Sequence, residues 1–85
     1  MTGELMLKQA AAVVANRRET YGDPVTSMTA IAQRWSITLD QPITPAQVAL
    51  CLIDLKLARL THQPDHIDSM VDIAGYAAVL REVSP

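Results

Sequence analysis

Apolar residues recur at intervals of three and four along most of the chain, which is the period of an amphipathic α-helix. We expect a first helix from about Glu4 to Arg18. The apolar face of this helix is predicted to contain Met6, Ala10, Val13 and Val14. The sequence ETYGDP follows, and its glycine and proline predict a break.

A second helix is expected to open at Asp23 and Pro24. Aspartate is a favoured N-cap, and proline suits the first helical position because its missing N–H has no partner there. Its predicted apolar face consists of Met28, Ile31, Ala32 and Trp35. The pattern fades at SITLDQPI, where we expect the chain to reverse direction.

The third helix has the clearest start, since TPAQ places Thr44 at the N-cap and Gln47 three residues on, as in a capping box. The helix is predicted to run to about His62. One stripe contains Leu50, Ile53, Leu57 and Leu60, whereas Leu52 and Leu55 lie off it. A helix that is apolar on more than one side is expected either in the centre of a bundle or between two subunits.

A fourth helix is expected after Pro64, with Asp65 as its N-cap and its end near Glu82. The chain shows no strand pattern, repeat or linker. The sequence therefore predicts one all-α domain over residues 1–85, built as a four-helix up-down bundle with short connections. Hydrophobic residues make up 49% of only 85 residues, so we expect homo-oligomerisation to bury part of the apolar surface.

Composition narrows the functional class. The formal net charge of −2 and the absence of a basic patch argue against nucleic-acid or membrane-surface binding. The single Cys51 excludes an internal disulfide and a CxxC metal site. No apolar run is long enough to span a membrane and the N-terminus does not resemble a signal peptide, so a cytoplasmic location is expected.

Acidic residues on the fourth helix are the first candidates for chemistry. At about 100° per residue, Asp68 and Asp72 lie about 40° apart, and Gly75 and Tyr76 extend the same side. Two carboxylates one turn apart can share a Mg²⁺ ion. Capping explains Asp68 equally well, but it does not explain Asp72 two turns into the helix. Gly75 marks either a close helix contact or the approach of a ligand.

Basic and aromatic residues supply a possible counterpart. Lys56 and Arg59 share one face of the third helix and can reach either a phosphate or the acids of the fourth helix. The segment RRETYGDP adds Arg18 and Tyr21, preceded by Arg17, at the mouth of a possible pocket.

The combination RRETYGDP, IAQRWS, ITPAQVALCLIDLKLARL and HIDSMVDIAGYAAV resembles a phage and prophage family of small domains of unknown function. That family in turn resembles the MazG-like all-α nucleotide pyrophosphohydrolases. The resemblance implies a homodimer or homotetramer that cleaves nucleoside triphosphates with Mg²⁺. It implies Asp68 and Asp72 as metal-binding and catalytic residues, and Lys56 and Arg59 as phosphate contacts. The residues by themselves suggest Arg18, Tyr21 and Tyr76 as further nucleotide contacts. The family's ExxE motif is absent from this chain.

Three functions stay open on this basis. The first is a Mg²⁺-dependent pyrophosphohydrolase, and the second is a non-catalytic module that binds or sequesters a nucleotide. The third is a structural or interaction protein whose polar face is only solvated.

Overall fold

The computed structural model describes residues 1–85 and contains four α-helices and no strand. The all-α class and the number of helices are therefore confirmed. The helices are α1 (Gly3–Tyr21), α2 (Pro24–Leu39), α3 (Pro45–His62) and α4 (Ile67–Val83). None of the four combines the length with the apolar character that a membrane-spanning helix needs.

Local sequence signals set most helix starts. Asp23 caps α2 by accepting a hydrogen bond from the Val25 N–H at 2.9 Å. The Thr44 and Gln47 capping box at the start of α3 is formed in full. The prediction of Asp65 as the cap of α4 is wrong, because Asp65 belongs to the turn that follows α3. His66 is the N-cap instead, and its Nδ1 accepts a hydrogen bond from the Ser69 N–H.

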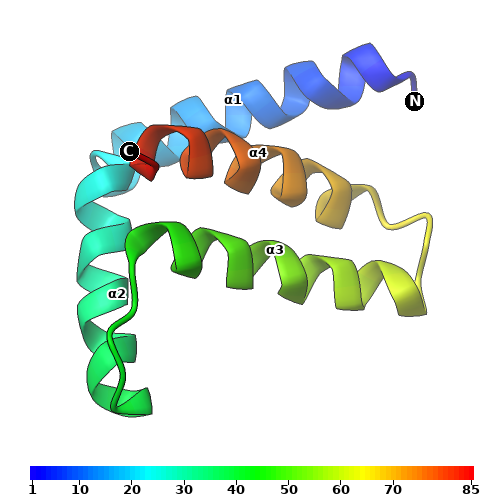
Figure 1. Ribbon diagram of the computed structural model, residues 1–85. Helices are drawn as coiled ribbons and strands as arrows, with labels where there is room; N and C mark the ends of the chain where they lie inside the picture. The colour runs from blue at the N-terminus through cyan, green and yellow to red at the C-terminus, as the bar shows by residue number, and fades with distance from the viewer.

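Three helices lie side by side, with α4 in the middle (Figure 1). The most extensive packing is between α3 and α4, which run antiparallel, while α1 packs on the other flank of α4 and does not reach α3. The central helix is thus α4. The two-sided apolar character of α3 does not reflect a central position, and its outer flank is exposed.

The up-down arrangement expected from the short connections is not observed. α1 and α4 run in the same direction, and α2 crosses one end of the layer (Figure 1). The chain turns into α2 within two residues, of which Gly22 has φ 83°, a conformation that glycine adopts without strain. α2 crosses the layer because its apolar stripe is buried against the ends of two helices. That stripe packs against the first turns of α3 and the last turns of α4, through Val48, Leu52, Val79 and Val83.

This junction of α2, α3 and α4 is the hydrophobic core. Met28, Ala32 and Val48 are buried together, with Ile31, Trp35 and Ile43 packed around them. Ser36 ties the connecting loop to α2, since its hydroxyl donates to the Ala32 carbonyl and accepts from the Ile43 N–H. After α2 the connecting segment turns back beside α2, as predicted, but α3 then runs across α2 and not antiparallel to it (Figure 1). α1 contributes only Ala10 to the buried residues.

Candidate functional site

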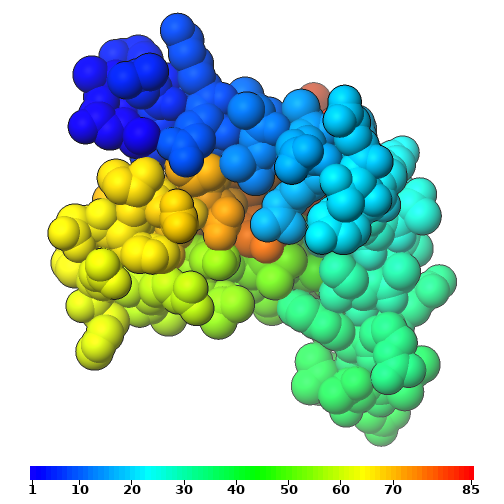
Figure 2. Space-filling view, turned by 180° about the vertical axis from the view of Figure 1, so that it is seen from behind, coloured from blue at the N-terminus to red at the C-terminus, as the bar shows by residue number.

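A cleft of about 560 Å³ is lined by the C-terminal half of α1, the first half of α2, Leu52 of α3 and the middle of α4. Figure 2 shows this side of the molecule, with α4 at the bottom of a hollow between α1 and α3. Ligand pockets of proteins fall in this size range. The apolar lining comes from all four helices and includes Val13, Val14, Met28, Ile31, Leu52, Val71 and Val79.

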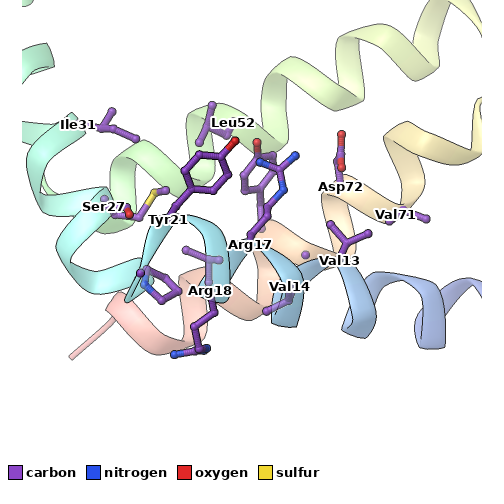
Figure 3. Close-up of a pocket in the computed structure, with 16 residues that line it drawn as sticks. Val13, Val14, Arg17, Arg18, Tyr21, Ser27, Ile31, Leu52, Val71 and Asp72 are labelled. Atoms are coloured by element: carbon purple, nitrogen blue, oxygen red, sulfur yellow. The ribbon is translucent and has the colours of Figure 1, made fainter.

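The polar side chains of the cleft gather on one side. Arg17, Tyr21 and Asp72 point to the same side in Figure 3, whereas Arg18 points away from them. Tyr76 also lines the cleft. Tyr21 lines the cleft and is 70% exposed, so it lies at the mouth. The arrangement combines one cation, two phenol rings and an apolar floor.

Asp72 is already engaged by a lysine. The Nζ of Lys56 on α3 lies 2.9 Å from Oδ2 of Asp72 on α4, and the two side chains are only 17% and 23% exposed. The reading of Lys56 and Asp72 as an interhelix ion pair is therefore confirmed. Asp72 is the acid that capping could not explain, and its ammonium partner accounts for its position inside α4.

The remaining predicted residues of the charged face lie apart from this pair. Asp68 and Arg59 are exposed, line neither cavity and form no ion pair. No three His, Cys, Asp or Glu side chains lie together in a way that would hold a metal ion. A Mg²⁺ ion at Asp68 and Asp72 would find two carboxylates, one of them neutralised by Lys56. Mg²⁺ is commonly held by one or two carboxylates together with water and substrate phosphates, so the remaining oxygen ligands of an octahedron would have to come from these, and the magnesium site stays a prediction.

The two arginines that precede the α1–α2 turn have different roles. Arg18, the residue predicted to contact a ligand, donates from Nη2 to Oε1 of Glu82 at the C-terminal end of α4. Arg17 forms no ion pair and points into the cleft. Helical periodicity could have distinguished them, because Arg17 follows Ala10 by seven residues and so shares its inward face. Arg18 is turned by about 100° from that face.

Gly75 lies on the floor of the cleft. A Cβ added there would meet only Cγ2 of Val14 on α1, at 3.5 Å, which is an ordinary van der Waals distance. The contact between α1 and α4 therefore does not require glycine at this position. Close helix packing therefore does not by itself account for Gly75, and the approach of a ligand stays a prediction.

Comparison with known proteins places the chain among phage proteins. The model of a domain of unknown function, DUF6378, matches residues 5–84. The Gene 55 protein of Mycobacterium phage L5 is 40% identical over 68 residues, which are 79% of this chain and 44% of that protein. The Gene 55 protein of Mycobacterium phage D29 is 32% identical over 81 residues, 94% of this chain and 54% of that protein. The chain thus spans about half the length of these curated relatives.

No solved structure matches the chain. The expected resemblance to a phage family of unknown function is confirmed, whereas the comparisons give no support to its second step, the likeness to MazG-like enzymes. The match over residues 5–84 leads to one assignment: this chain belongs to the DUF6378 family, and the curated relatives that it matches are phage proteins.

Proposed function

We propose that the chain binds a small anionic molecule with a flat, partly apolar body, of the nucleotide class, in the cleft between its four helices. The unpaired Arg17 beside two tyrosines carries this proposal. A guanidinium group presents several N–H donors in a plane and binds phosphate oxygens in pairs. Tyrosine rings stack on nucleobases of any sequence.

The balance of charge in the cleft favours an anion over a metal ion. Lys56 neutralises Asp72, and Glu82 neutralises Arg18. Arg17 is therefore the charged residue of the cleft that has no ion-pair partner, and it gives the cleft a net positive charge. The chain as a whole carries a formal net charge of −2. An anion that enters the cleft gains an attractive partner without having to displace a carboxylate.

The enzymatic alternative is Mg²⁺-dependent cleavage of a nucleoside triphosphate to a monophosphate and pyrophosphate. It rests on the MazG-like resemblance, which implied Asp68 and Asp72 as ligands. Asp72 would first have to leave Lys56, and a general base for activating water is not evident in the cleft. Binding without metal is therefore the function that the geometry favours.

Mass spectrometry of the protein purified from cells and then denatured would identify a bound small molecule. Isothermal titration against a panel of nucleoside mono-, di- and triphosphates and cyclic dinucleotides, with EDTA in one arm and Mg²⁺ in the other, would measure affinity. We expect binding in both arms. Binding and pyrophosphate release only with Mg²⁺ would favour the enzyme.

The matched pair for this experiment is Arg17→Met and Arg34→Met. Both arginines are exposed, but Arg34 lies on α2 and does not line the cleft. Removing Arg17 should weaken nucleotide binding by about 10- to 100-fold, the effect of one lost charged contact. Arg34→Met should leave affinity unchanged. If no nucleotide binds, or if both variants behave alike, the cleft is not a nucleotide site and a structural role is the better description.

A further inference from the structure

The isolated chain exposes more surface than a protein of its mass should. Its accessible surface is 5874 Å², whereas about 5,000 Å² is typical of a 9.3 kDa monomer. Its radius of gyration is 13.5 Å, compared with about 12 Å for a compact domain of 85 residues. The excess of roughly 900 Å² is close to the area that each partner buries in a protein–protein interface of standard size, about 800 Å².

One exposed apolar side chain lies at the end of α2. The apolar stripe of α2 runs through Met28, Ala32 and Trp35 and continues at the same spacing to Leu39. The first three pack into the core, but Leu39 is 58% exposed. The reason is visible in Figures 1 and 2, where the last turn of α2 projects beyond α3.

The outer flank of α3 supplies the adjoining surface. Leu50 and Leu57 are seven residues apart, so they lie in one row, and each is 48% exposed. This row lies on a flank of α3, about 100° to 120° around the helix from Lys56, which reaches α4. Asp54 is turned by about 40° to 60° from the two leucines, so it borders the row.

We infer that a second copy of this chain covers the surface formed by Leu39, Leu50 and Leu57, which we call the α2–α3 corner. This arrangement suits a two-fold dimer. In such a dimer, the last turn of α2 of each copy, with Leu39, packs on the Leu50 and Leu57 row of the other copy. The size of the excess surface fits one such contact. The dimer is independent of ligand binding, since none of the three leucines lines the cleft.

Sedimentation equilibrium of the purified chain tests this directly. We expect a mass of about twice 9.3 kDa at micromolar concentration. Leu50→Glu and Leu57→Glu should each raise the dimer dissociation constant by about 100-fold or more, because a charge would be buried without a partner. Leu5→Glu is the control, since Leu5 is 54% exposed on α1, away from the corner.

The three leucines are exposed in the single chain, so the variants should keep the helical circular-dichroism spectrum of the unaltered protein. A chain that stays monomeric up to millimolar concentration would overturn the inference. So would a dimer that Leu5→Glu dissociates while Leu50→Glu and Leu57→Glu do not. In either case, the excess surface must be covered by something other than this contact.

Discussion

The ammonium of Lys56 and the carboxylate of Asp72 meet 2.9 Å apart between α3 and α4. This is the one ion pair that joins the two most closely packed helices, and both partners are largely shielded from water. A shielded charge is costly without its partner, so each residue constrains the other. The pair holds Asp72 at the edge of the cleft, and it also means that the Asp72 carboxylate is not a free negative charge there.

Breaking the pair from either side should destabilise the fold. We expect Lys56→Met and Asp72→Leu each to lower the free energy of unfolding by about 1 to 3 kcal/mol, since the remaining charge is left partly buried. The double variant should recover most of that loss, because two apolar side chains of similar size can pack together. Urea unfolding of the four proteins measures the coupling. Strictly additive losses would show that the two charges do not depend on one another.

Gly75→Ala should increase stability while impairing the cleft. Alanine is favoured over glycine inside a helix by about 1 kcal/mol, and the added methyl group meets only a Val14 methyl at an ordinary distance. The same methyl group takes space from the floor of the cleft. Thermal unfolding should therefore show a higher midpoint, and titration with the nucleotide identified by mass spectrometry should show weaker binding. A destabilised variant would mean that α1 and α4 cannot accommodate the methyl group.

His66 should be replaceable only by another capping residue. Its Nδ1 accepts from the Ser69 N–H and lies 2.7 Å from Oγ of Ser69, which is buried. His66→Ala should cost about 1 kcal/mol, the usual effect of losing an N-cap. His66→Asn restores an acceptor at the same position and should retain most of the stability. Equal losses in the two variants, measured by urea unfolding, would contradict this role.

Arg18 and Glu82 should contribute little to stability. Their side chains are 46% and 41% exposed, and exposed ion pairs are typically worth less than about 1 kcal/mol. Arg18→Met should therefore shift the unfolding free energy by a few tenths of a kcal/mol, and added salt should abolish even that difference. A larger loss would indicate that this pair holds the end of α1 against α4.

Much of the fold was predictable because its signals are local. Asp23 with Pro24, and Thr44 with Gln47, start helices through hydrogen bonds within three residues, and the structure has both starts as expected. His66 was missed because histidine is an uncommon cap and Asp65 stood beside it. The arrangement of the helices depends on contacts between distant segments, such as Ala32 with Val48, which no local pattern specifies.

The candidate site, like the fold, was predictable from local spacing only in part. The spacing of Lys56 and of Asp72 put each on a face that could reach the other, and the structure brings them together. The seven-residue spacing from Ala10 favours Arg17 for the cleft, but the pairing of Arg18 with Glu82, at the far end of the chain, is a contact that no local pattern specifies. Asp68 and Arg59 matched the same faces as Asp72 and Lys56, but they lie near the turn that connects α3 to α4 and remain exposed.

By itself the sequence determined the class, the four helices, the N-caps of α2 and α3 and the family, because these depend on periodicity and on hydrogen bonds between near neighbours. Only the tertiary structure decided that α4 is central, that α2 crosses one end, that Arg17 is the free cation of the cleft and that Asp72 is held by Lys56. The reason is physical: an amphipathic helix specifies which face it buries, but the partner for that face is set by the packing of the whole chain.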